Sequence, residues 1–128
     1  MTSALNRTLG AATTAYGVAI LLRPRWLARP CGLPTAPDGS ATADTAPLIR
    51  MIGARDAVIG VAMTCAGGDR ARRVATWCRI GCDIGDAAIL GACLPSKAHR
   101  AKAASIALAW AALNAYSLGG AGTRRGAR

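Results

Sequence analysis

The sequence predicts an all-α protein, an antiparallel bundle of four transmembrane helices. Three observations lead to this prediction. Four long apolar segments follow one another between residues 5 and 122, separated by polar stretches. Their residues are mostly small, with many alanines and glycines and no phenylalanine, and small residues let helices pack closely in lipid. Basic residues gather between the apolar segments, as they do at the two faces of a membrane.

The first segment, residues 5–22, is short for a membrane span. Arg7 and Arg23 lie near its two ends, and their long side chains can reach the head groups. No small-residue cleavage site follows, so we expect a retained helix and not a signal peptide. A loop with five prolines comes next and extends to Pro47. Trp26 in this loop has the character of an interfacial anchor.

The second and third segments, residues 47–66 and 74–94, both contain charged residues. A short loop joins them, which predicts antiparallel neighbours. The fourth segment, residues 103–122, has no charged residue and has the length that a helix needs to cross a bilayer. The last residues, 123–128, form a basic tail that we expect to be disordered. The whole chain is therefore expected to form one domain, residues 1–122, followed by this tail.

A soluble helical domain is the alternative fold. The charges in the second and third segments favour it. A helix on the surface of a soluble domain should have a polar stripe along one side. In the fourth segment this stripe is reduced to Trp110, Asn114 and Ser117, which favours the membrane bundle.

The composition limits the classes of partner. The formal net charge is +10, which first suggests nucleic acid. The basic residues form no stripe with interleaved aromatics and no known nucleic-acid module, so we expect membrane lipids as partners and no nucleic acid. We expect the protein in the membrane, specifically a bacterial plasma membrane. Assembly into a homo-oligomer stays open.

The sequence predicts no metal site and no cofactor. Five cysteines are present with one histidine, and an odd number of cysteines in apolar segments argues against a disulfide framework. Asp83 and Asp86 form a D-x-x-D pair, and carboxylates are the ligands that Mg²⁺ prefers. A second acidic motif is missing, and Arg79 on the same helix face competes for both carboxylates.

Charged residues occur at the centres of the two middle segments. Asp56 lies at the centre of residues 47–66, and Asp83 lies next to the centre of residues 74–94. Two antiparallel helices of this length place both aspartates at a similar depth. Arg79, Asp83 and Asp86 share one helix face at positions i, i+4 and i+7. We therefore expect them to meet Asp56 near the bilayer midplane.

This set of charges is nearly neutral. Arg55, Arg79, Asp56, Asp83 and Asp86 sum to −1, and Arg50 brings the sum to zero. Charges in hydrocarbon are costly unless they are paired or hydrated, so the balance indicates one network. In a functional interpretation the three aspartates are candidate catalytic residues, and Arg50, Arg55 and Arg79 hold the substrate or the partner carboxylates. In a structural interpretation the same network only fixes the register of the helices.

The chain resembles an uncharacterised family of small four-helix integral membrane proteins, a domain of unknown function of the DUF4267 type. The stretches LLRPRWLA, LIRMIGARDAVIGVAM and RVATWCRIGCDIGDAAI carry the resemblance. The resemblance implies the four-helix membrane fold. It implies no activity, although some relatives lie beside enzymes of specialised metabolism.

Three functions fit these expectations. The first is acid–base chemistry on, or binding of, a lipophilic small molecule, with Asp56 or Asp83 exchanging the proton. The second is proton-coupled transport of a small molecule, although the first segment has no Glu of the kind that small multidrug exporters use. The third is a non-catalytic role as a membrane assembly factor or partner protein. Whether the protein is an enzyme is left open.

Overall fold

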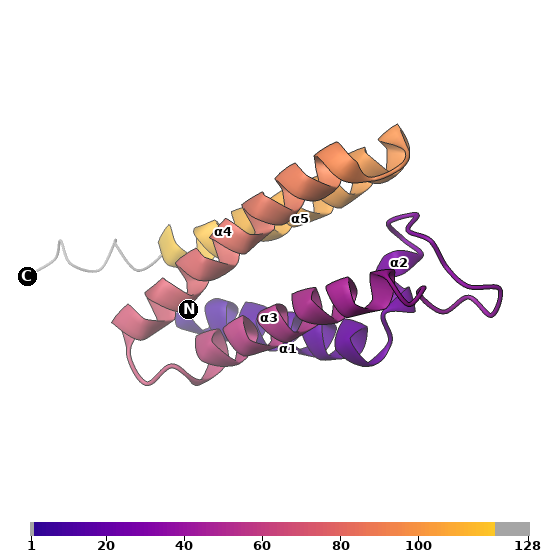
Figure 1. The fold of residues 1–128 in the computed structure, drawn as a ribbon. Helices are drawn as coiled ribbons and strands as arrows, with labels where there is room; N and C mark the ends of the chain where they lie inside the picture. Colours follow the sequence, from indigo (N-terminus) through magenta and orange to yellow (C-terminus); the bar gives the residue numbers. More distant parts are fainter. Residues whose placement is uncertain (1, 120–128) are drawn as a thin grey trace, which may run out of the picture.

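The four long helices form two layers, each a pair of helices, in this computed structural model of residues 2–119 (Figure 1). The first layer pairs α1 with α3, and the second pairs α4 with α5. The helices are α1 (Thr2–Leu22), α2 (Arg25–Ala28), α3 (Thr45–Cys65), α4 (Asp69–Cys93) and α5 (Lys97–Gly119). Within the described range the only strand-like feature is an isolated bridge between Thr35 and Ala41. The all-α prediction is confirmed.

Every long helix begins earlier than its apolar segment. The differences are largest for α4, which begins at Asp69 and not at residue 74, and for α5, which begins at Lys97 and not at residue 103. The extra turns are rich in Arg, Lys and Ala, which are good helix formers. The apolar segments therefore underestimate the lengths of the helices. The predicted end of the fourth segment, residues 120–122, and the tail, residues 123–128, lie outside the described residues.

Glycines bring α1 and α3 into backbone contact. A Cβ built on Gly17 would lie 2.7 Å from the carbonyl oxygen of Gly53, and one on Gly60 would lie 2.5 Å from the carbonyl oxygen of Gly10. The pairing of Gly17 with Gly53 and of Gly10 with Gly60 shows that the two helices are antiparallel. Backbones approach this closely only where no side chain intervenes. The helix that packs closely against Gly53 and Gly60 is therefore α1.

The two layers are close at one end and diverge toward the turn between α4 and α5 (Figure 1). At the close end, Asn6 Nδ2 donates to Thr76 Oγ1 and to Ser117 Oγ, both at 2.9 Å, and so joins α1 to α4 and α5. At the open end, α2 and the loop after it pack on the first layer through a cluster centred on Ile20, Ala28 and Ile49.

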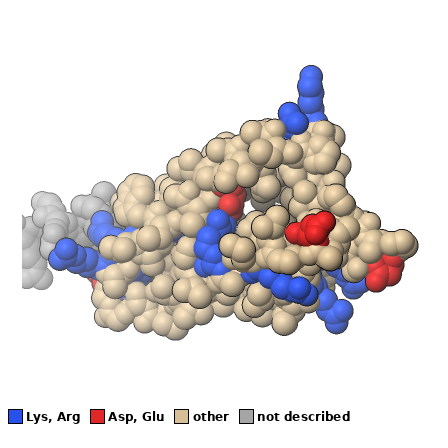
Figure 2. Space-filling view, in the orientation of Figure 1, with Lys and Arg blue, Asp and Glu red and all other residues tan. Residues whose placement is uncertain are grey.

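Many polar side chains are inside the bundle, and many large apolar side chains are exposed on its outside. The buried polar and charged residues come from all four long helices: Asn6, Thr13, Asp56, Thr76, Arg79, Asp83, Asn114 and Ser117. Among the exposed large apolar residues are Leu22, Met51, Val58, Trp77, Ile89, Ile106 and Tyr116. The thin polar stripe of the fourth segment, Trp110, Asn114 and Ser117, thus faces inward. Figure 2 shows few charged atoms over the middle of one face, with acidic and basic atoms meeting in the hollow between the layers.

No helix in residues 2–119 combines the length and the apolarity needed to cross a membrane. Alanine and glycine are only weakly apolar, and charged residues interrupt α3 and α4 and open α5. The expected four transmembrane spans are therefore not supported by the hydropathy of the observed helices.

Candidate functional site

The charged residues at the centres of α3 and α4 form one buried cluster between these two helices. Asp56 projects from the middle of α3, and Arg79 and Asp83 project from α4; all three are buried, with Asp83 only 1% exposed. Arg55 and Asp86 lie at the edge of the cluster and are half-buried. The predicted meeting of Asp56 with the charged face of the next helix is observed.

Asp56 is the centre of this cluster. Its Oδ1 accepts a hydrogen bond of 3.0 Å from Arg55 Nε and lies 2.9 Å from Arg55 Nη2. The same oxygen lies 2.7 Å from Arg79 Nη1. Two guanidinium groups, one from each layer, therefore share a single carboxylate oxygen.

Each arginine also holds a second aspartate. Arg55 binds Asp86 with two parallel hydrogen bonds, of 3.0 Å from Nη1 and 2.7 Å from Nη2. Arg79 donates from Nε to Asp83 Oδ2 at 3.1 Å and from Nη2 to Asp83 Oδ1. Such two-point contacts are the strongest form of the Arg–carboxylate interaction. The result is a continuous chain from Asp86 through Arg55, Asp56 and Arg79 to Asp83, which we call the ionic chain.

Arg50 lies outside the ionic chain. Its side chain is exposed, and it forms no ion pair with the residues that the structure describes. Six helical residues correspond to a rotation of about 120° between Arg50 and Asp56, so the two side chains point in different directions. The expected neutral sum is therefore wrong for the observed chain, which contains three carboxylates and two guanidinium groups and carries −1.

The ionic chain forms one wall of a cavity of about 350 Å³ between the two layers. Its other walls are mainly apolar. They come from the following residues on α1, α2, the loop after α2, α3, α4 and α5: Ala12, Leu27, Pro30, Ile52, Leu90, Ala103, Ile106 and Ala107. Asp56, Arg79, Asp83 and Asp86 all line the cavity. The arrangement is an apolar chamber with a single strongly polar patch.

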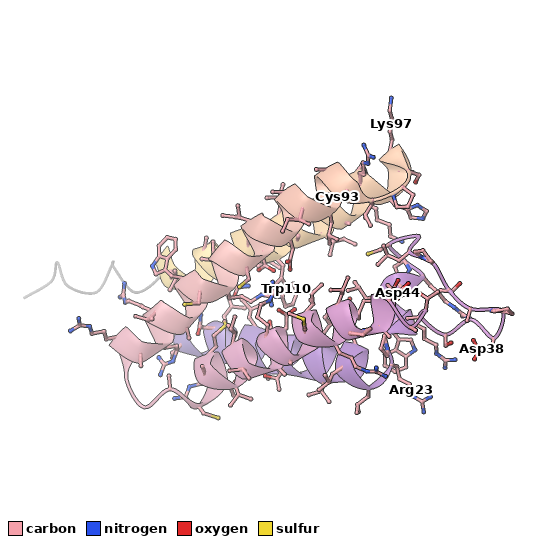
Figure 3. The ribbon with its side chains drawn as sticks, viewed as in Figure 1. Arg23, Asp38, Asp44, Cys93, Lys97 and Trp110 are labelled. Atoms are coloured by element: carbon pink, nitrogen blue, oxygen red, sulfur yellow. The ribbon has the colours of Figure 1, made fainter. Side chains whose placement is uncertain are left out.

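Two aromatic residues complete the polar side of the cavity. Trp110 lies between the layers (Figure 3) and donates from Nε1 to Thr13 Oγ1 at 3.1 Å. Tyr16, one turn after Thr13, also lines the cavity, and its hydroxyl has no hydrogen-bond partner among the described residues. The sequence partly indicates that Thr13 and Tyr16 line one site, because the two residues share a face of the first helix. Nothing in the spacing of Trp110 assigns it to the same chamber.

Cys31 and Lys102 lie at the edge of the cavity and were not predicted from sequence. Cys31 is buried in the loop after α2, and burial raises the pKa of its thiol, although the nearby Lys102 acts in the opposite direction. A raised pKa keeps the thiol protonated and poorly nucleophilic at neutral pH. Gly32, which follows Cys31, has a positive φ of 64° and packs against the ring of His99. This contact holds the loop against α5.

The carboxylates of the site are engaged by arginine. Among the described residues, no group of three or more His, Cys, Asp or Glu side chains is arranged to hold a metal ion. The D-x-x-D pair does not act as a unit, because Asp83 binds Arg79 and Asp86 binds Arg55. The site is suited to hydrogen bonding and proton exchange with a bound molecule.

A family model described as Domain of unknown function (DUF4267) matches residues 10–122. No curated protein and no solved structure is significantly similar to the chain. The matched range contains the ionic chain and every residue that lines the cavity.

Proposed function

The chain belongs to the DUF4267 family, and we propose that it binds a lipophilic small molecule between its two layers. The description of the family assigns no activity, so the proposal is argued from the site itself. The observation that carries the proposal is the cavity. It has the volume of a small-molecule site and combines apolar walls with one patch of polar groups, which is the usual composition of such sites. The apolar walls would hold the body of the ligand, and the patch would orient it.

Asp56 is the residue that we assign to contact with the polar end of the ligand. Its Oδ1 is occupied by both arginines, whereas its Oδ2 makes no hydrogen bond or ion pair with a described residue. In this proposal Oδ2 accepts a hydrogen bond or a proton from the ligand. Asp83 and Asp86 act indirectly, because they hold Arg79 and Arg55 in place. Acid–base chemistry would require a ligand with an acidic proton next to Oδ2.

The proposal includes a membrane as the surroundings of the bundle. Its support is the distribution of side chains, because each of the four long helices buries at least one polar residue and exposes several large apolar residues. Val58 is 70% exposed two residues from the buried Asp56. Lipid would cover such an apolar surface, and intramembrane charges characteristically face the interior of a bundle. A lipophilic ligand would then enter from the lipid.

An alkaline carbonate wash of membranes tests this placement. A tagged protein that stays in the pellet and leaves only with detergent agrees with integral insertion. A protein that washes into the supernatant would remove the membrane from the proposal and leave the cavity to be tested by itself.

Ligand binding can be followed through Trp110. Trp26 and Trp77 are both exposed, so replacing them with Phe leaves Trp110 as the single tryptophan, inside the cavity. We expect terminally brominated decanol to quench Trp110 saturably in nanodiscs of phosphatidylcholine. Ala107→Phe fills the cavity and should abolish this quenching. Ala109→Phe, on the exposed side of α5, is the matched control and should preserve it.

Equal quenching in both phenylalanine variants would contradict binding in the cavity. It would favour the structural interpretation of the ionic chain, in which the charges fix the register of the helices.

A further inference from the structure

We infer that the ligand is a lipophilic ammonium ion, with its N–H group on Asp56 Oδ2 and its apolar body in the cavity. The inference rests on the proposed function and adds the chemical class of the ligand. Three independent features of the site support it: an open carboxylate oxygen, an uncompensated charge and a pair of aromatic rings.

Asp56 Oδ2 is the open acceptor of the site. The ionic chain contains six carboxylate oxygens, and five of them contact a guanidinium group. Oδ2 is the sixth. Asp56 is only 3% exposed and lines the cavity. A carboxylate oxygen without a donor, on a residue at the wall of a cavity, is a position where a ligand can donate a hydrogen bond.

The charge of the ionic chain favours a donor that is positive. Each aspartate has an arginine partner, but three aspartates and two arginines leave one net negative charge, and a net charge in a buried cluster is unfavourable. Lys102 is the remaining basic residue among those that line the cavity, but its side chain is exposed at the edge and forms no ion pair with the described residues. A cation on Oδ2 would neutralise the chain inside the cavity.

The aromatic rings fit the same class of ligand. Only five Phe, Trp or Tyr residues occur in the whole chain, three Trp and two Tyr, and two of them, Tyr16 and Trp110, line the same cavity as Asp56. The faces of such rings attract ammonium groups, and tryptophan does so most strongly. A cavity that combines a carboxylate with aromatic rings is a chemical environment suited to an amine.

A series of ligands with one tail and three head groups separates the alternatives. The probes are terminally brominated decylamine, decanol and decanoate, added to the protein with Trp110 as its single tryptophan in phosphatidylcholine nanodiscs. An alkylamine is protonated at neutral pH, as a lysine side chain is. We expect the amine to quench Trp110 at a concentration at least about ten-fold lower than the alcohol, and the carboxylate to bind most weakly.

Variants of the site test the contact itself. Asp56→Asn should weaken binding of the amine by about ten-fold or more and change binding of the alcohol by no more than about two-fold. Tyr16→Leu, at a half-exposed position without a hydrogen bond, should weaken the amine selectively, by about three-fold. Tyr16→Leu tests the ammonium class independently if the Asp56→Asn variant does not fold. Asp44→Asn, an exposed aspartate at the start of α3 that forms no capping bond, is the control for loss of one negative charge.

The outcomes are distinguishable. If none of the three probes quenches Trp110 saturably, the proposed function fails together with the inference. If the alcohol binds as tightly as the amine, or if the amine is insensitive to Asp56→Asn and to Tyr16→Leu, the cavity binds lipophilic molecules but the ammonium class is wrong.

Discussion

Arg79 and Asp83 illustrate how single residues determine the stability of this bundle. Both side chains are buried, and each has the other as a two-point partner. Arg79 also reaches Asp56 across the layers. Removing Arg79 leaves Asp83 buried without a cation, whereas removing both residues leaves no orphaned member of the pair, because Asp56 still has Arg55. The ionic chain should therefore respond very differently to single and double substitution.

We expect Arg79→Met to lower the free energy of unfolding by about 3–5 kcal/mol, because Asp83 is then buried without a cation. The double variant Arg79→Met with Asp83→Leu should be less destabilised than Arg79→Met, because it contains no unpaired member of that pair. Thermal unfolding followed by circular dichroism in one detergent measures both. Asp69→Asn, in the exposed ion pair with Arg72, is the control and should change stability by less than about 1 kcal/mol. A double variant worse than the sum of its single variants would argue against this account.

Asn6 has a comparable role at the close end of the bundle. The Thr76 hydroxyl donates to the carbonyl of Arg72, and the Ser117 hydroxyl donates to the carbonyl of Asn114. Both hydroxyls must therefore accept from Asn6, so its amide orientation is fixed. Asn6→Leu should lower the free energy of unfolding by about 1–3 kcal/mol, because two buried hydroxyls lose a donor. Thr8→Ala, which removes an exposed hydroxyl two residues away, should cost much less in the same unfolding measurement.

At the scale of the helices, sequence predicted the site better than it predicted the helix ends. The positions of Asp56, Arg79, Asp83 and Asp86 followed from helix periodicity, because a fixed rotation per residue determines which side chains share a face. The pairing of α1 with α3 was less accessible, since it depends on which glycines meet. The polar starts of α4 and α5 were not predicted, because apolarity reports burial and not helix formation. Arg50 was included for its charge alone, and the rotation of the helix turns its side chain away from Asp56.

The close contact between α1 and α3 predicts that alanine substitutions at different glycines change stability in opposite directions. Gly17→Ala places a methyl group against the backbone of Gly53 and Ala57, and we expect it to lower the free energy of unfolding by about 1–3 kcal/mol. Gly81→Ala is the matched control. A Cβ at Gly81 meets nothing within 4 Å, so the higher helix propensity of alanine should stabilise α4 by about 0.5–1 kcal/mol. The same sign of change in both variants would mean that the two helices are not packed as described.

At the scale of the whole molecule, the position of the side chains and the hydropathy of the helices point in different directions. The hydropathy of each helix averages over inward-facing and outward-facing residues, so buried charges on α3 and α4 lower it. Large apolar side chains nevertheless occur on the outward surface, and Val58, Met51 and Ile89 are all more than 60% exposed. Averaging along the sequence loses this distinction, and the three-dimensional structure recovers it.

A lysine scan of the outward face of α3 separates lipid from water as its surroundings. In lipid, Val58→Lys puts a charge at the depth of Asp56 and should sharply reduce the carbonate-resistant fraction of the protein, because the cost of a charge is largest at the bilayer centre. Leu48→Lys lies near the start of α3 and is also exposed. Its side chain can extend to the head groups, so this variant should behave like the unmodified protein. In water both lysines would be harmless, and an unchanged distribution of Val58→Lys between pellet and supernatant would contradict a lipid-covered bundle. The ordering of the two variants is informative because they place the same charge on the same helix and differ only in depth.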